Sequence, residues 1–472
     1  MKFRLFFHIF FLAAILTTTG AECRGEDYKL LTVGLHYDSD VSGGVLSPAD
    51  MVELSRSQEI DAVIFCDHLR REVEYGVHPL RNIVRKKVKY SSIDAFGADS
   101  YLRLMQKLDD EYSDMTVIPG AEVGPMYYWE GNLWDKNLEL HNWHQHMLVI
   151  GLDDPEEYAD IPGVGSGIRE GMSAAGRYRL FGGSAAILLG IIFLFIRTRK
   201  IYSFAGQRMS ATRHPLRLPG ALLIIAGLAV IANDFPFREK KYSPYEGNSR
   251  RQATQDVVDY VNDKGGLIYF AHPEAGHEET LDGIPIRTRP YCELLLQVKD
   301  YTGFAVFAEG WKEAGKPGGY WDMVLNDYLQ GKREKPAWVV GEVDFEGTLP
   351  EKFLRETCTY VWAQNNSREA ILEALKRGCC YASQRWGPNT VWLNRWAVSD
   401  DLGNSAISGE TIEAAGDINI DFTLDTAEGE ENFAVVLVRN GEEYTKLLFD
   451  EGGEFQFRDN PPVGMNYYRL WV

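Results

Sequence analysis

The segment LLTVGLHYDSDVSGGVLSP, residues 30–48, carries the pattern that decides the fold. An apolar run ends in His36, and Asp38 and Asp40 follow within four residues. A Gly-Gly turn comes next, and the Ser-Pro pair at the end is typical of the cap and first turn of a helix. A strand that ends in an imidazole beside carboxylates indicates either a metal site or a polar loop before a capped helix. The rest of the chain has to decide between these two interpretations.

The same pattern recurs along the chain, where short apolar runs end in or beside His, Asp or Glu. Continuous apolar runs of this length are typical of strands that are buried on both faces of a parallel sheet. Helical patterns lie between several of the runs, at 47–60, 100–112 and 250–266. About seven alternations of strand and helix predict an α/β fold with a closed barrel. The polar residues at these strand ends are His36, Asp38, Asp67, His68, Glu122, His146 (which begins its run), His272, Glu309, Glu342 and Asp344.

The position of these residues in the barrel matters more than their number. In such barrels the carboxyl ends of the strands meet at one rim, and active sites are built there. Imidazole and carboxylate groups are ligands for Zn²⁺, Mn²⁺ and Fe²⁺. Taken alone, each residue is more often structural, since a strand-end Asp caps the next helix and a His packs in a core. Together at one rim they indicate a centre for two or three divalent ions.

The order of the motifs resembles that of a known family. Five segments carry the resemblance: LHYDSDVSGGVLSP (35–48), CDH (66–68), IPGAE (118–122), HML (146–148) and GGLIYFAHP (265–273). They are similar to motifs of the PHP superfamily (polymerase and histidinol phosphatase domains), whose members are metal-dependent phosphoesterases. The resemblance implies a distorted seven-stranded (β/α) barrel. It covers residues 28 to about 384, apart from an insertion at 155–245. The segment 365–383 looks like the helix and strand that close such domains.

The sequence departs from the family pattern at two places. The second His of the opening pair is Asp38, and the Asp of the family's Ser-Asp-Gly is Gly43. The closing Gly-Ser-Asp-x-His is GEVDF here, so Glu342 or Asp344 would have to substitute for the His. Oxygen ligands favour a harder ion such as Mn²⁺ or Mg²⁺ over Zn²⁺, but the same changes suit a site that has lost an ion or lost catalysis. The ligands that the resemblance implies are His36, Asp38, His68, Glu122, His146 and His272, with Asp40, Asp67, Glu342 and Asp344 as second choices.

The resemblance implies a reaction as well as a site. Two or three divalent ions (Mn²⁺, Zn²⁺, Fe²⁺ or Mg²⁺) would supply hydroxide for the hydrolysis of a small phosphorylated substrate. Asp67 could protonate the leaving oxygen or orient His68. Arg70 and Arg71 follow this strand end and could hold phosphate, or could be solvated surface residues.

Three apolar segments indicate a membrane. Residues 1–22 read as a secretory signal peptide or an N-terminal anchor. The runs near 180–196 and 218–235 are apolar on all sides and are predicted to form a transmembrane hairpin, although a buried helix is the alternative for the second run. Their link is basic and contains no acidic residue, which favours a cytoplasmic position for the link and an extracytoplasmic one for the barrel. Its charged residues are Arg197, Arg199, Lys200, Arg208, Arg213 and Arg217.

Composition and the C-terminal pattern complete the division into domains. The chain has 472 residues and a formal net charge of −19, which argues against nucleic acid as a partner. Six cysteines without a CxxC pair do not form a disulfide framework. After Ser383 the strands alternate polar and apolar residues, which predicts an antiparallel β-sandwich. The expected parts are a first barrel segment at 28–154, an insertion at 155–245, a second barrel segment at 246–384 and the β-sandwich at 385–472.

Three hypotheses for function follow. The first is a membrane-tethered, extracytoplasmic phosphoesterase that uses divalent metal. The second keeps the barrel as a non-catalytic sensor or scaffold that binds metal or another ligand, and Asp38 and Gly43 motivate it. The third makes the hairpin the functional part, with the barrel as a ligand domain that sends a signal inward.

Overall fold

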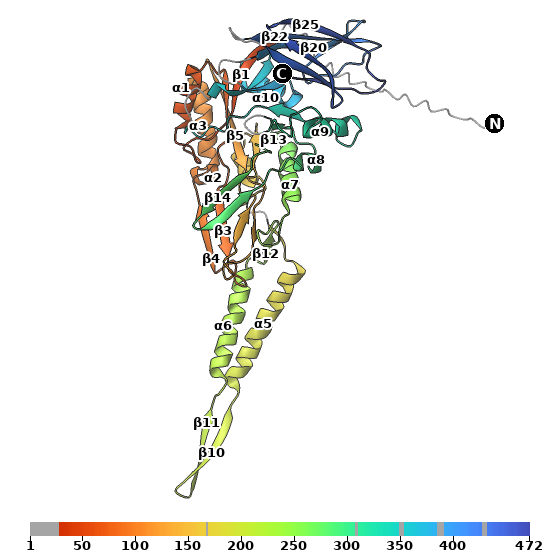
Figure 1. The fold of residues 1–472 in the computed structure, drawn as a ribbon. Helices are drawn as coiled ribbons and strands as arrows, with labels where there is room; N and C mark the ends of the chain where they lie inside the picture. Colours follow the sequence, from red (N-terminus) through yellow and green to blue (C-terminus); the bar gives the residue numbers. More distant parts are fainter. Residues whose placement is uncertain (1–27, 167–168, 307–309, 349–353, 385–390, 427–431) are drawn as a thin grey trace, which may run out of the picture.

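The computed structural model describes residues 28–166, 169–306, 310–348, 354–384, 391–426 and 432–472. The predicted signal or anchor at 1–22 and the strand-end residue Glu309 lie outside these ranges. The described chain is elongated, with a barrel in the middle, two antiparallel sheets at one end and a helical hairpin at the other (Figure 1).

A curved mixed sheet of nine strands forms the barrel. The segment after its last parallel strand returns to the first strand, because the Val343 and Phe345 N–H groups donate to the carbonyls of Leu35 and His36, each at 3.0 Å. The predicted α/β barrel is therefore confirmed as a nearly closed, barrel-like mixed sheet. In spatial order the strands are β17 (Trp338–Val340), β16 (Gly303–Ala305), β13 (Leu267–Phe270), β8 (Met147–Ile150), β5 (Thr116–Val123), β2 (Ala62–Phe65), β1 (Lys29–Tyr37), β18 (Thr357–Ala363) and β19 (Cys380–Gln384).

Strand number and strand direction differ from the prediction of a parallel seven-stranded barrel. β8 runs antiparallel to both β5 and β13, and β18 runs antiparallel to β1 and β19. The cause lies in the connections. The segment between β5 and β8 forms the short strands β6 (Tyr128–Glu130) and β7 (Glu139–His141) instead of a crossover helix, so β8 returns in the opposite direction.

The helices cover the outside of the barrel. Ser47 caps the first of them, since its hydroxyl accepts the Asp50 N–H, as the sequence predicts. The helix over 98–111 buries Tyr101, Met105 and Leu108, which lie on one face at helical spacing. The helices are α1 (Pro48–Ser57), α2 (Ile93–Phe96), α3 (Ala98–Glu111), α4 (Pro155–Asp160), α7 (Arg250–Asp263), α8 (Leu294–Gln297), α9 (Tyr320–Leu329) and α10 (Arg368–Arg377).

Three small sheets lie between the barrel and the hairpin (Figure 1). One is the ribbon β3 (Glu72–Gly76) and β4 (Arg85–Lys89), which follows directly after the strand end that carries His68. The second places β14 (His277–Leu281) and β15 (Ile284–Thr288) beside β7 and β6. The third pairs β9 (Arg169–Gly171) with β12 (Arg238–Lys240) at the base of the hairpin.

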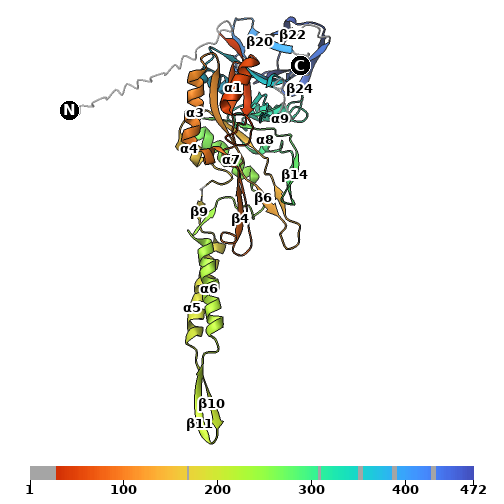
Figure 2. The ribbon, with the colours of Figure 1, turned by 90° about the vertical axis from the view of Figure 1, so that its left-hand side faces the viewer.

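The predicted membrane segments form two long antiparallel helices, α5 (Ala174–Phe195) and α6 (Arg217–Asp234). Both are long and apolar enough to cross a bilayer, and only 11% and 17% of their most apolar windows are buried in the protein. The basic link between them is a two-stranded ribbon, β10 (Thr198–Phe204) and β11 (Gln207–Arg213), which continues away from the barrel (Figure 2). The two helix backbones approach each other closely at glycines. A Cβ on Gly190 would lie only 2.6 Å from the carbonyl oxygen of Gly220.

The C-terminal part contains two antiparallel sheets that pack face to face. Their shared core includes Ile420 of one sheet and Leu437 of the other. This matches the sandwich expected from the alternating pattern. The sheets are β21 (Ser405–Ile407), β20 (Val391–Asp400), β22 (Ile418–Thr426) and β25 (Gly453–Asp459), and β24 (Glu442–Phe449), β23 (Phe433–Arg439) and β26 (Tyr468–Trp471).

Candidate metal centre

Four imidazoles from distant strand ends meet inside the carboxyl end of the barrel. They belong to His36 at the bulge near the end of β1, to His68 after β2, to His146 before β8 and to His272 after β13. Their rings are close, with centroids 5.2 Å apart for His68 and His146 and 5.6 Å apart for His146 and His272. With Glu122 and Glu342 they form what we call the buried centre.

The backbone is strained where it delivers two of these rings. His36 has φ of 72° and His272 has φ of 27°, a region that residues other than glycine rarely adopt. Such conformations cost roughly 1–3 kcal/mol each and gather at functional sites. The β1 bulge at His36 turns its ring toward the barrel interior, where the side chain is fully buried.

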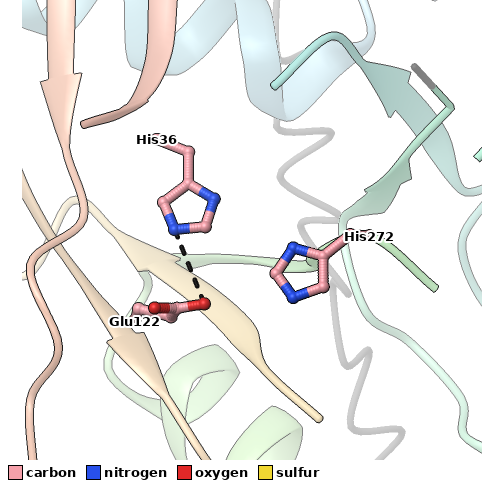
Figure 3. Close-up of side chains that lie close together, drawn as sticks. All are labelled: His36, Glu122 and His272. Carbon is pink, nitrogen blue, oxygen red and sulfur yellow. Dashed lines mark ion pairs between the residues drawn. The ribbon is translucent and has the colours of Figure 1, made fainter. Parts of the chain in front are cut away.

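Glu122, in β5, contacts three of the four imidazoles. Its Oε1 lies 2.6 Å from His146 Nδ1 and 3.5 Å from His36 Nε2, and its Oε2 lies 2.8 Å from His68 Nδ1. The carboxylate is almost fully buried. In Figure 3 a dashed line joins the carboxylate to the ring of His36, and the ring of His272 lies beside them. One carboxylate therefore joins two groups of potential metal ligands, His36–Glu122–His272 and His68–Glu122–His146.

Glu342 lies behind two of the rings. Its Oε2 is 3.0 Å from His36 Nδ1, and its Oε1 is 3.3 Å from His272 Nδ1 and accepts the His272 backbone N–H at 2.5 Å. A carboxylate on Nδ1 fixes the tautomer and directs Nε2 of the same ring to the opposite side. Nε2 of His36 is buried there, and no described residue forms a hydrogen bond with it.

The charges of the centre stabilise one another. Burial alone would lower the pKa of His68 and of His272, but Glu122 and Asp38 beside the first, and Glu342 beside the second, raise the pKa of each to about 9. Burial opposes ionisation of Glu342, yet His272 and His36 lower its pKa to about 2. A cation bound in the centre would balance the charge of the buried carboxylates in place of these imidazole protons.

Asp38, in the loop after β1, and Asp67, which follows β2, are both buried and share a hydroxyl partner. The Ser42 hydroxyl lies 2.6 Å from Asp38 Oδ1 and 2.8 Å from Asp67 Oδ1. One hydroxyl proton cannot serve both carboxylates. Burial, and then the charge of Asp38, raise the pKa of Asp67 to about 7. Asp38 Oδ2 also lies 3.6 Å from His68 Nε2, so Asp38 lies at the edge of the buried centre.

Several predicted site residues lie elsewhere. Asp67 receives the Ser39 N–H and hydroxyl, and among the described residues it forms no hydrogen bond or ion pair with His68, which the sequence interpretation had allowed. Asp40 is exposed and, within the described chain, contacts no side chain of the buried centre. Asp344, whose side chain is 45% exposed, lies 3.6 Å from His36 Nε2 at the mouth.

The two arginines after His68 differ. The guanidinium of Arg70 is bound to Asp94 at 2.8 Å and to the carbonyls of residues 158, 159 and 161, so all three of its nitrogens have partners and the side chain holds the α4 region. Arg71 instead lies over the ring of Tyr90, and its Nη1 is 2.7 Å from where a Cβ on Gly43 would be. Its charge acts on His68. Gly43 thus leaves room for a guanidinium beside the buried centre.

Sequence reasoning missed two sets of residues. Ser39 and Ser42 hold the buried carboxylates, and nothing in a Ser-rich loop distinguishes them from turn residues. A further cluster, His144, His277 and Glu279, lies near the rim, with potential ligand atoms within 4.8 Å of one another. The sequence carried weak signals for it, namely the HNWHQH segment and the His-x-Glu spacing.

Comparison with known proteins gives distant similarities. No family model and no curated protein matches the chain. A two-domain protein from Bacteroides vulgatus, containing a predicted PHP-like metal-dependent phosphoesterase, is 11% identical over 93% of this chain and 89% of its own, with a TM-score of 0.37. A candidate metal-dependent phosphoesterase from Bifidobacterium adolescentis is 14% identical over 67% and 87%, with a TM-score of 0.28. An amidohydrolase from Chromobacterium violaceum, with bound sulfate and no metal, is 13% identical over 66% and 87%, with a TM-score of 0.25. At this distance, function has to be argued from the side chains of the buried centre.

Proposed function

We propose that this protein is a metal-dependent phosphoesterase of PHP type, tethered to a membrane with its barrel on the extracytoplasmic side. The observation that carries the proposal is the buried centre, in which Glu122 joins two groups of imidazoles and His36 Nε2 finds no hydrogen-bond partner among the residues that the structure describes. A buried polar atom without a partner costs about 1–3 kcal/mol and calls for an explanation.

The donor atoms fit divalent ions. His36 Nε2 lies 3.5 Å from Glu122 Oε1 and 3.6 Å from Asp344 Oδ1, which is too long for hydrogen bonds but suits ligands that share one cation. Mixed imidazole and carboxylate donors suit Zn²⁺, Mn²⁺ or Fe²⁺ better than Mg²⁺. We propose two ions, held by the two groups that share Glu122.

The side chains take distinct roles in this proposal. Divalent ions bound there would act as Lewis acids, which make water nucleophilic near neutral pH and neutralise charge on a phosphoryl group. Glu342 orients His36 and His272, so it positions ligands and need not be one. Arg71 would bind the phosphate as a bidentate donor. Asp67 holds the loop that presents Asp38. Arg70 is not part of the proposed phosphate site, because its guanidinium is bound to Asp94 and to three backbone carbonyls.

The membrane part of the proposal rests on uncovered apolar surface. Large side chains of both helices are exposed, for example Ile192 at 57% and Ile225 at 63%. Soluble proteins rarely leave apolar patches of this extent uncovered. The basic ribbon between the helices has no acidic residue, which favours its cytoplasmic location.

Three variants and one control variant test the catalytic proposal. The full-length protein, purified in detergent and supplied with Mn²⁺ or Zn²⁺, is assayed for metal content and for hydrolysis of a panel of phosphate mono- and diesters. We expect His68→Ala, His272→Ala and Asp38→Asn to lose metal and at least about 100-fold in kcat/KM. Asp40→Asn, in the same loop but exposed, should retain both. No hydrolysis by a fully metallated wild-type protein would contradict the catalytic proposal.

The membrane proposal has its own test. Gly171 and Arg238 pair directly at the base of the hairpin, so a two-residue Asn-Gly turn can replace residues 172–237 without disturbing this ladder. We expect the full chain to remain with membranes after alkaline extraction and the shortened chain to be soluble with its metal retained. Release of the full chain by alkali would contradict membrane insertion.

A second candidate function is a non-catalytic sensor, and one structural observation favours it. The β3–β4 ribbon starts next to Arg71. Asn82, in the turn between its strands, donates two hydrogen bonds to Asn233 of α6, at 2.8 and 2.7 Å. A ligand at the buried centre could therefore act on the hairpin. Tight metal binding without turnover on the phosphoester panel would support this function over the first.

A further inference from the structure

A second group of metal-ligating side chains lies outside the buried centre, at the rim of the barrel. His144 Nε2 is 3.0 Å from Glu279 Oε1, and His277 Nε2 is 3.8 Å from Glu279 Oε2. The two imidazole rings lie together, with centroids 3.8 Å apart and planes inclined by 40°. One carboxylate thus faces two adjacent imidazole nitrogens.

We propose that His144, His277 and Glu279 form a separate site for a divalent transition-metal ion, which we call the rim site. For tetrahedral Zn²⁺ with bonds of about 2.0–2.2 Å, ligand atoms lie roughly 3.3–3.5 Å apart. The separations of 3.0 Å from His144 Nε2 to Glu279 Oε1 and 3.8 Å from His277 Nε2 to Glu279 Oε2 lie on either side of this value, and one ligand atom of each residue lies within 4.8 Å of the others. Three protein ligands leave one position open to water or to an anionic group.

The fold holds these ligands in place. His277 and Glu279 are two residues apart in β14, so their side chains lie on the same face of the strand. β14 pairs with β15, and β15 pairs with β7. On the other side, the His144 backbone N–H donates to the Thr288 hydroxyl of β15 at 3.0 Å. The side chains are therefore positioned by backbone pairing, and little order has to be created when an ion binds.

An ordinary surface ion pair does not account for this cluster. Within the described chain, no Lys or Arg pairs with Glu279, whereas the adjacent Glu278 has Arg287 at 3.9 Å. The partners of Glu279 are therefore the two imidazoles. The negative charge of Glu279 is balanced much better when the carboxylate and both imidazoles bind one cation. The imidazole content favours Zn²⁺ and its neighbours over Mg²⁺ or Ca²⁺.

The rim site is independent of the proposed function, although it is adjacent to the buried centre. The rings of His144 and His146 are 6.0 Å apart, so the rim site would join β14 to the loop that carries a residue of the centre. The side chains of His144, His277 and Glu279 are 20%, 47% and 44% exposed. The ion would exchange with solvent more easily than ions in the buried centre.

Metal titration of the full-length protein in detergent tests the proposal. The protein is depleted with a chelator and titrated with Zn²⁺ or Co²⁺ alone, for wild type, Glu279→Gln, His277→Ala and the control Glu278→Gln. We expect wild type and Glu278→Gln to bind one more equivalent than the two rim variants, or to bind the last equivalent at least about tenfold more tightly. The Co²⁺ absorption in the visible range should lose one component in the rim variants.

The same experiment separates this inference from the buried centre. His272→Ala should lose metal from the centre and keep the rim equivalent. Equal stoichiometry, affinity and Co²⁺ spectra for wild type, Glu279→Gln and His277→Ala would overturn the rim site, whatever the buried centre binds. Because His277 and Glu279 are exposed, these variants keep the core intact, and circular dichroism verifies this.

Discussion

The Nδ1 atom of His36 lies 3.0 Å from Oε2 of Glu342, although the two residues are 306 positions apart in the chain. This contact joins the end of β1 to the segment that follows β17, at the place where the barrel closes. The carboxylate of Glu342 is fully buried and fixes the ring of His36. The carboxylate of Glu342 also lies 3.3 Å from His272 Nδ1, so it contacts two of the four imidazoles.

The first prediction concerns this carboxylate. Glu342→Gln keeps the shape of the side chain and removes the charge that supports His36 and His272. We expect the affinity for Zn²⁺ or Mn²⁺ to fall by roughly 10–100-fold, as for other residues that orient metal ligands. Competition with a chromophoric chelator measures this affinity. Unchanged affinity in Glu342→Gln would show that the carboxylate does not support the ligands.

The second prediction concerns pH. Without metal, the pKa of His68 and of His272 is about 9, above the ordinary value of 6.5. These raised values add stability that is full below pH 6.5 and is lost as pH rises through 9. Metal binds only the deprotonated rings, so metal affinity should rise between pH 6.5 and 9 and then level off.

Calorimetric titration with Zn²⁺ in two buffers of different ionisation enthalpy checks this. We expect release of on the order of two protons per centre at pH 7.5. The metal-free protein should also lose thermal stability between pH 6.5 and 9, while the metal-loaded protein should not. Affinity that is flat over this range would show that the imidazoles are already neutral.

The third prediction concerns the helix pair. A side chain at Gly190 would meet the Gly220 carbonyl oxygen at 2.6 Å and Ile224 Cγ1 at 2.7 Å, so Gly190→Leu must push α5 and α6 apart. We expect a loss of about 1–3 kcal/mol of stability, seen as a lower midpoint of thermal unfolding in detergent. Gly182→Leu is the control, because nothing lies within 4 Å of its added Cβ. Equal effects of both variants would argue against close packing.

The fourth prediction concerns the junction between the barrel and the C-terminal sheets. Arg469 of β26 binds Asp322 of α9 through two hydrogen bonds of 2.7 and 2.6 Å, and both side chains are buried. Arg469→Met leaves a buried carboxylate without its cation, which should cost about 3–5 kcal/mol in urea unfolding. Arg469→Met with Asp322→Leu should recover much of this loss. No recovery in the double variant would indicate a role beyond the ion pair.

The strand-end residues could be located from sequence because two rules coincide. Buried strands read as apolar runs, and their carboxyl ends gather at one end of a barrel, so His36, His68, Glu122 and His272 were expected near one another. Their roles as ligands stay a prediction. The cap at Ser47 was also readable, because it depends on local chemistry alone.

The features that sequence could not supply depend on distant contacts. The antiparallel direction of β8 follows from the absence of a crossover helix after β5, which apolar patterns do not reveal. Arg70 and Arg71 are neighbours, yet one fastens the α4 region and the other lies beside Gly43. Adjacent residues of the same type can therefore have different roles, and only coordinates separate them.

The bonds between Asn82 and Asn233 have a geometric consequence if α5 and α6 cross a bilayer. The β3 strand spans about 17 Å at roughly 3.4 Å per residue, and it separates the buried centre from the point where α6 is held. The β3–β4 ribbon then holds the barrel at a set height above the lipid, with the mouth of the barrel turned toward the bilayer. Substrates that diffuse in the thin aqueous layer beneath it would have access, whereas a phosphate embedded among the headgroups would first have to leave the leaflet.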